Sequence, residues 1–149
     1  MNTHINNYRL YFVVTLVTLF ISCSSDDESP EPIPEPTIAE LLANKWYFVK
    51  VVDNTTTPPT ETILDDCQQN GYLEFMEEGS LVQEQFYLDG SSCTSSGPDN
   101  LTYILSEDES QISMTFENNS TTIALIDVLT ETELVITSYD GKNEIHFVR

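Results

Sequence analysis

The sequence predicts an all-β domain: a small up-and-down antiparallel β-barrel of eight strands, preceded by one short helix. Three observations lead to this fold class. Short segments alternate apolar and polar residues, tight-turn sequences separate them, and no long amphipathic helix interrupts the series. An antiparallel meander with one apolar face tends to close, because closure removes the exposed sheet edges. The lack of a strand–helix–strand rhythm excludes nucleotide-binding α/β folds.

The short helix is predicted at the start of the domain. Thr37 and Glu40 have the spacing of a capping box, in which the Thr hydroxyl accepts from an early helix amide and the Glu carboxylate reaches back to the amide of the cap residue. Apolar residues follow as far as Ala43, so the helix is expected to end near Asn44. After this point the periodicity changes to two.

The strands are assigned from this two-residue periodicity and from the turns between them. Asp140-Gly141 is a strong two-residue hairpin signal before the final strand. Turns are also expected at Glu77–Gly79, Glu107-Asp108 and Asn118-Asn119, and such tight connections make antiparallel neighbours. We expect strands at 46–52, 72–76, 81–88, 101–105, 112–116, 121–128, 134–139 and 143–148.

Alternation within the strands predicts which side chains face the interior. The inward face is expected to carry Tyr103, Leu105, Ile112, Met114, Phe116, Ile123, Leu125, Leu134, Ile136, Ile145 and Phe147. The candidate groups for filling the barrel are its largest side chains: Trp46, Phe75, Tyr103, Met114, Phe116 and Phe147. An eight-stranded barrel has an interior that side chains fill or that one small ligand occupies. These large residues favour filling, and a ligand cavity is the alternative.

Residues 1–22 have the plan of a secretory leader, with a polar start and an apolar run that is too short for a comfortable membrane span. Residues 20–23, Phe-Ile-Ser-Cys, resemble the lipobox of bacterial lipoproteins, with Phe where that family usually carries Leu. The resemblance implies that Cys23 is acylated and becomes the first residue after cleavage. An ordinary cleaved leader or an uncleaved anchor are the other readings.

Residues 23–36 are expected to form a tether, and residues 37–149 to form the barrel domain. The tether is rich in Ser, Asp, Glu and alternating Pro, a composition that favours an extended polyproline II spacer. Its acidic start, Ser24 to Glu28, resembles the export signal by which Bacteroidetes lipoproteins reach the outer face of the outer membrane. The surface and the periplasmic face both stay open, because such a run also serves as a soluble spacer.

The charge of the chain excludes one class of partner. All 25 acidic residues and only four of the five basic residues lie after residue 22, and the whole chain carries a net charge of −20. Nucleic acid phosphates and anionic lipid headgroups repel so acidic a protein. Nucleic-acid binding is therefore not expected.

The cysteine count is consistent with export. Acylation of Cys23 leaves Cys67 and Cys93 as a pair, and disulfides persist outside the cytoplasm. A redox or metal pair is the rival reading, but no Cys-x-x-Cys spacing and no neighbouring His supports it. We therefore predict a structural disulfide between Cys67 and Cys93.

Catalytic and metal-binding patterns are weak. After the leader the only histidine is His146, which alternates with inward residues and is expected to point outward. The carboxylate pairs lie in turn-like segments, where water leaves their pKa ordinary, so glycoside hydrolysis is not indicated. A weak calcium site at the turn 107–109 is an alternative, although the run lacks the spaced pattern of calcium loops. No catalytic residue, cofactor or metal is assigned.

Several features together resemble the lipocalin-like domain of Bacteroidetes lipoproteins. They are the helix Ile38–Leu42, the strand start Lys45-Trp46, the pair Cys67 and Cys93, the phrase Gly71–Phe75 followed by Gly79, and the closing meander. Typical lipocalins place Gly two residues before the first-strand Trp, where this chain has Asn44. The resemblance implies a barrel with one open mouth that holds a small hydrophobic molecule.

The sequence thus predicts a monomeric lipoprotein, anchored in the outer membrane by acyl chains and not an enzyme. Its domain is expected to be a binding module for a small apolar ligand or for an envelope protein. The alternative is an accessory lipoprotein whose barrel is filled and whose outer surface alone makes contacts.

Overall fold

A computed structural model describes residues 34–149, of which Glu35–Arg149 form one compact unit. The predictions for the leader, for Cys23 and for most of the tether fall on residues 1–33 and lie outside the described residues.

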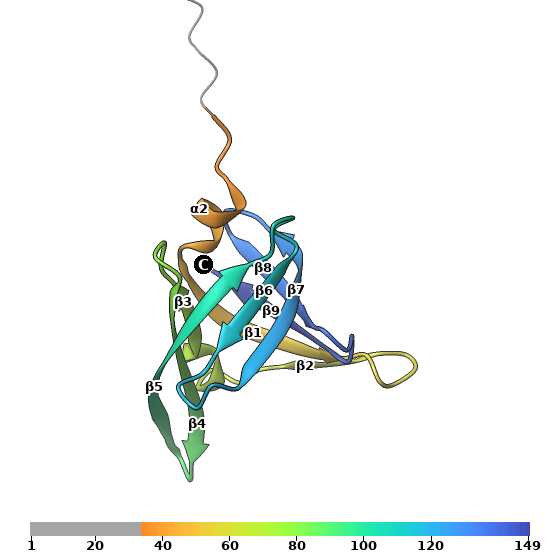
Figure 1. Ribbon diagram of the computed structural model, residues 1–149. Coiled ribbons are helices and arrows are strands. Elements are labelled where there is room, and N and C mark those ends of the chain that lie inside the picture. The colour runs from red at the N-terminus through yellow and green to blue at the C-terminus, as the bar shows by residue number, and fades with distance from the viewer. Residues whose placement is uncertain (1–33) are drawn as a thin grey trace, which may run out of the picture. The chain divides into compact units, whose positions relative to one another are not determined.

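The domain consists of one short α-helix, one 3-10 helix and nine strands (Figure 1). In chain order these elements are α2 (Ile38–Leu42), β1 (Lys45–Asp53), β2 (Thr60–Ile63), η1 (Gln68–Asn70), β3 (Tyr72–Phe75), β4 (Ser80–Asp89), β5 (Ser92–Leu105), β6 (Gln111–Thr115), β7 (Thr121–Leu129), β8 (Glu133–Ser138) and β9 (Asn143–Val148).

Eight of the strands close into the predicted antiparallel barrel. Strands β3 to β9 pair in sequence order, and β1 pairs with β3 at one end of the sheet and with β9 at the other. The ninth strand, β2, pairs only with β1 and was not predicted. Its residues are all exposed and show no apolar alternation. Only their antiparallel pairing with residues 50–53 of β1 makes this segment a strand.

The helix α2 covers one end of the barrel (Figure 1). The predicted capping box is confirmed: the Glu40 amide donates to Thr37 Oγ1 at 3.2 Å, and the Thr37 amide donates to Glu40 Oε2 at 2.7 Å. Leu42 and Trp46 are fully buried, and the indole Nε1 of Trp46 donates to the Leu42 carbonyl oxygen at 3.0 Å. This hydrogen bond attaches the helix to the first barrel strand.

Large apolar side chains occupy the barrel interior. Five of the six candidate interior residues are buried, with at most 9% of their surface exposed: Trp46, Phe75, Tyr103, Met114 and Phe147. The sixth, Phe116, is half-buried and packs against this core. The phenol of Tyr103 donates to the Met76 carbonyl at 2.8 Å, which satisfies its polar atom. The interior is therefore largely filled by side chains.

The predicted inward face of β7 was wrong. Ala124, 4% exposed, and Ile126 belong to the core, whereas Ile123 and Leu125 lie on the outer face. The sequence from 123 to 126 is apolar at four consecutive positions, so its alternation is ambiguous. Pairing with β6 sets the register: Ala124 lies opposite the fully buried Ile112 and therefore on the same inward face.

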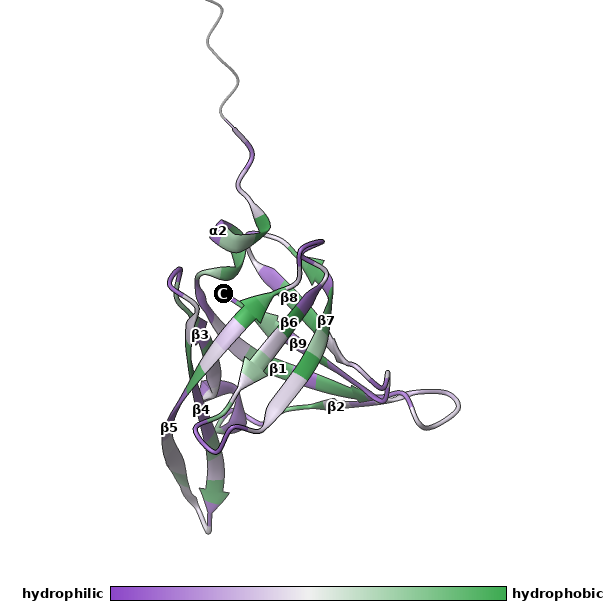
Figure 2. Ribbon diagram, viewed as in Figure 1, coloured by the Kyte–Doolittle hydropathy of each residue, from purple (hydrophilic) through white to green (hydrophobic). Residues whose placement is uncertain are grey.

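Part of β4 and β5 extends beyond the barrel. Strand β3 pairs with β4 only as far as Glu84, and β6 pairs with β5 only from Thr102 onward. Residues 86–89 and 92–95 therefore pair with each other alone, and we call the segment 86–95 the arm (Figure 1). Figure 2 shows apolar colouring at the end of β4, where Tyr87 and Leu88 are 50% and 54% exposed.

The register of β7 can be tested with a pair of matched substitutions. Ile126→Ala is expected to lower the free energy of unfolding by about 2 kcal/mol, because the lost methyl groups contact the core. Ile123→Ala on the outer face is expected to change it by less than about 1 kcal/mol. Urea unfolding followed by tryptophan fluorescence measures both, and the opposite ranking would mean that β7 has the predicted and not the observed face inward.

Candidate functional site

A cavity of about 170 Å³ opens at the mouth of the barrel. It lies beside Phe48, which follows Trp46 in β1 and is farther from α2. Its lining combines three large apolar side chains, two amides and one glycine. The residues are Phe48, Leu64, Gln68, Gly71, Gln85 and Phe86. We call this cavity the mouth pocket.

The mouth pocket is shallow because the barrel behind it is filled. Phe48 faces inward from β1, and its ring centroid lies 4.7 Å from that of Phe147, which is fully buried. These two rings separate the pocket from the core around Trp46. A bound molecule would therefore rest on Phe48 and not enter the centre of the barrel.

Gly71 shapes one wall by permitting a close approach. There is little space beside its Cα atom. A Cβ at this position would lie 3.0 Å from the Phe48 ring, 3.0 Å from the Gln68 carbonyl oxygen and 3.2 Å from the Glu84 carbonyl oxygen. The Phe48 amide also donates to the Gly71 carbonyl at 3.0 Å. Glycine is favoured here because a Cβ would crowd the Phe48 ring and two backbone carbonyl oxygens.

Two glutamines supply the polar groups of the mouth pocket. Gln68 Oε1 accepts from the Asp65 amide at 3.1 Å, which fixes the orientation of this side chain. Among residues 34–149, neither Gln68 Nε2 nor the side-chain amide of Gln85 makes a hydrogen bond. Both amides are therefore available to a bound molecule at the rim of an otherwise apolar pocket.

A hydrogen-bond network on the outer face fixes the base of the arm. The Glu84 carboxylate accepts from the Ser95 hydroxyl and, at 2.9 Å, from the Tyr72 hydroxyl. These two bonds, that of Ser95 above all, hold the pKa of Glu84 below its usual range. Lys45 lies 3.5 Å above the Tyr72 ring and 3.2 Å from Glu74. The network joins β3, β4 and β5 at the level where the arm leaves the barrel.

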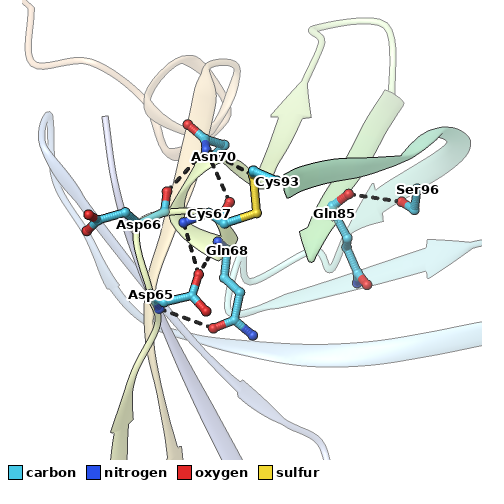
Figure 3. Close-up of a disulfide and its surroundings, with 8 residues drawn as sticks. All are labelled: Asp65, Asp66, Cys67, Gln68, Asn70, Gln85, Cys93 and Ser96. Carbon is cyan, nitrogen blue, oxygen red and sulfur yellow. Dashed lines mark hydrogen bonds between the residues drawn. A yellow bond between two sulfur atoms is a disulfide. The ribbon is translucent and has the colours of Figure 1, made fainter. Parts of the chain in front are cut away.

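The predicted disulfide joins Cys67 and Cys93, with their Cα atoms 5.4 Å apart (Figure 3). It links the start of η1 to the arm strand of β5. The mouth pocket takes Gln68 from η1, and it takes Gln85 and Phe86 from β4, the strand that pairs with β5. The Asp65 carboxylate accepts from the amides of Cys67 and Gln68, both at 2.9 Å, and so orders the η1 side of the link. In the chain-entropy account a loop of this length adds about 3.5 kcal/mol of stability.

The candidate catalytic and metal-binding groups lie away from the mouth pocket. His146 points outward between Glu144, 2.5 Å from Nε2, and Glu133, 3.9 Å from Nδ1, with 18% of its side chain exposed. At the turn considered for calcium, Asp108 accepts hydrogen bonds from Ser106 and Ser110 instead. Within residues 34–149 no group of three or more His, Cys, Asp or Glu side chains is arranged to hold a metal ion.

No helix among residues 34–149 is long and apolar enough to cross a membrane.

Sequence reasoning missed most of the mouth pocket. Gly71 stood out only as part of the family resemblance, and Phe48 could have been found because it alternates with Trp46. Leu64 and Gln68 lie in a segment without periodicity, and Phe86 faces the pocket because a bulge between Glu84 and Phe86 shifts the pairing of β4 and β5. Neither feature leaves a signal in the sequence.

Comparison with known proteins supports the observed fold. A lipocalin-like protein from Bacteroides uniformis is 17% identical, with a TM-score of 0.53, over 73% of this chain and 98% of that chain. An uncharacterized protein from Bacteroides eggerthii is 12% identical, with a TM-score of 0.54, over 72% and 98%. Bovine odorant-binding protein complexed with undecanal is 16% identical over 80% and 77%, but its TM-score of 0.41 is too low for a comparison of sites.

A search of curated protein sequences found no match. A family model for the lipocalin-like domain matches residues 42–136, which extend from the end of α2 into β8 and include every residue that lines the mouth pocket. On this match, and with a closed eight-stranded barrel capped by one short helix, the chain belongs to the lipocalin-like domain family.

Proposed function

We propose that this protein is a lipid-anchored lipoprotein of the cell envelope, and that its barrel binds a small apolar ligand in the mouth pocket without catalysing a reaction. The observation that carries the binding function is the mouth pocket itself: a preformed apolar recess with two free amides at the open end of a lipocalin-like barrel. Sites for small molecules typically combine such apolar walls with a few polar groups.

The size and polarity of the pocket indicate the kind of ligand. Its volume of about 170 Å³ is below the roughly 300–1,000 Å³ of drug-sized sites and close to that of cavities that hold benzene. The amides of Gln68 and Gln85 favour a ligand with one hydrogen-bonding group. The net charge of −20 disfavours anions. A neutral molecule of one or two rings with a hydroxyl or an N–H group fits these constraints.

The pocket lining supports a function in binding and not in catalysis. None of the six residues that line it carries a titratable or nucleophilic side chain. General acid–base and covalent catalysis need such a group within hydrogen-bond reach of the reacting atom. His146, the one histidine among residues 34–149, lies on the outer face of β9.

The alternative function is that of an accessory envelope lipoprotein with a filled barrel and no small-molecule ligand. The observation that favours it is the fully buried interior, in which Trp46, Phe147 and Ile112 leave the pocket only the space beyond Phe48. In that case the outer surface alone would contact a partner protein.

The anchor part of the proposal depends on Cys23, at the end of a leader that resembles those of bacterial lipoproteins. Two or more acyl chains give stable attachment to a bilayer, whereas one gives only marginal binding. We place the protein in the outer membrane, on the surface or on the periplasmic side.

Indole is a suitable probe for the mouth pocket, because it is neutral, has two fused rings and carries one N–H group. The whole chain in detergent is expected to bind it, and Phe86→Ala is expected to weaken binding about tenfold by removing an apolar wall. Tyr87→Ala is the matched control, since Tyr87 lies next to Phe86 on the arm but does not line the pocket.

Isothermal titration measures the affinities, and amide chemical shifts of Gly71 and Gln68 report the location. Absence of indole binding by the wild-type chain would favour the accessory function. Equal losses in the two variants would place the bound probe outside the mouth pocket.

Acylation can be tested by growth of the producing cells with an azido fatty acid. The wild-type chain is expected to incorporate the label, and Cys23→Ser is expected to lose it, because acyl transfer needs the Cys23 thiol. Cys93→Ser serves as a control and should be labelled like the wild type. Labelling of Cys23→Ser at the wild-type level would contradict the anchor at this residue.

A further inference from the structure

We propose that the Cys67–Cys93 disulfide is a site of thiol–disulfide exchange that controls the mouth pocket: a dithiol reductant cleaves the bond, releases the arm and weakens ligand binding. The exchange reaction and the release of the arm are inferred from the structure around the disulfide. The effect on ligand affinity rests on the binding function proposed above.

The arm depends on the disulfide for its position. Residues 86–89 and 92–95 pair only with each other, so no neighbouring strand holds them against the barrel. Cys93 lies opposite Leu88 in the middle of this hairpin. Its bond to Cys67 is the covalent link from the arm to η1, and a single weak hydrogen bond accompanies it, from Asn70 Nδ2 to Cys93 Sγ at 3.7 Å.

The disulfide faces an open recess. A concavity of about 540 Å³ in front of it is lined by Asp65, Asp66, Cys67, Asn70, Leu88, Ser91 and Cys93 (Figure 3 shows all of these except Leu88 and Ser91). Cys93 is exposed, whereas Cys67 is only 6% exposed. Cys93 is therefore the more accessible of the two residues to an incoming thiolate, and the proposed exchange begins at its sulfur.

The exchange reaction balances with one dithiol. Its first thiolate attacks Cys93 Sγ, forms a mixed disulfide there and expels Cys67 as a thiolate, which takes up a proton. The second thiolate of the reductant then attacks the reductant's own sulfur in the mixed disulfide and releases Cys93, which is protonated in turn. The protein disulfide gains two electrons and two protons, and the dithiol is oxidised to a disulfide.

The acidic residues of the recess affect the rate. The Asp65 carboxylate is engaged by the amides of Cys67 and Gln68, but Asp66 is exposed and makes no such side-chain contact among the described residues. Its negative charge repels an approaching thiolate. Asp66→Asn should therefore speed the exchange, whereas Asp89→Asn, which removes a charge from the same arm but outside the recess lining, should leave the rate nearly unchanged.

Release of the arm would change the mouth pocket directly. Gln85 and Phe86 line the pocket at the base of the arm, and Gln68 and Gly71 line it beside η1. Tyr72 pairs with Glu84 across β3 and β4, so Gln85 stays beside Gly71 when the bond is broken. Phe86 lies beyond this last pairing of β4 with β3, on the arm that the disulfide links to η1, and the ligand loses contact with Phe86 when the arm moves away. The pairing of Tyr72 with Glu84 and the hydrogen bond between their side chains stay in place and form the base about which the arm moves.

The test compares the whole chain before and after treatment with dithiothreitol, with Cys93→Ser as a variant that cannot form the bond. Backbone NMR order parameters are expected to fall from about 0.85 to below about 0.6 at arm residues 86–95 and to remain unchanged at Ile112 and Leu134 in the core. Order parameters report motion within the folded state, so the lower global stability of the reduced chain does not affect them. Trapping with an alkylating reagent and mass measurement give the rate of reduction, which is expected to rise about threefold in Asp66→Asn. Indole affinity is expected to fall about tenfold on reduction.

Two results would overturn the proposal. Unchanged order parameters in the arm would show that the bond does not hold it, and an equal fall throughout the barrel would show that the bond orders the whole domain and not the arm. If the oxidised chain does not bind indole, the binding function fails, while the order parameters of the arm still decide whether reduction releases it.

Discussion

The structure depends on the pairing of β1 with β9. This contact turns a meander of eight strands into a closed barrel and removes the two open edges of the sheet. Closure also limits the interior, because eight strands enclose only enough space for side chains or for one small molecule. In this chain Trp46, Phe147 and Ile112 are fully buried in that space. The size of any ligand site follows from this single constraint.

The two ends of the barrel differ: a helix covers one, and the mouth pocket opens at the other. At one end, the capping box of α2 and the hydrogen bond from Trp46 to Leu42 fix a short helix over the strands. At the mouth, Phe48 forms the floor of a shallow recess, and Gly71 leaves room for its ring. A filled core and a small open pocket thus coexist, which is why the binding and accessory functions share one architecture.

The arm and the disulfide connect this pocket to its surroundings. The bulge between Glu84 and Phe86 directs an aromatic side chain toward the mouth, and the Cys67–Cys93 bond holds the hairpin beside η1. Since no strand outside the hairpin pairs with the arm, the Cys67–Cys93 bond, which faces an open recess, is its covalent link to η1. In the exchange that we propose, this bond links the redox state of its environment to the shape of the pocket.

By itself, the sequence determined what local patterns encode: the capping box at Thr37, the Asp140-Gly141 turn, the meander, and the Cys67–Cys93 pair through the cysteine count. Tertiary structure alone decided the inward face of β7, where four consecutive apolar residues leave alternation ambiguous and the pairing of Ala124 with the buried Ile112 sets the register. It also decided the strand β2 and the mouth pocket. The physical reason is that these features arise from pairing and packing between segments distant in the chain, which local periodicity does not record.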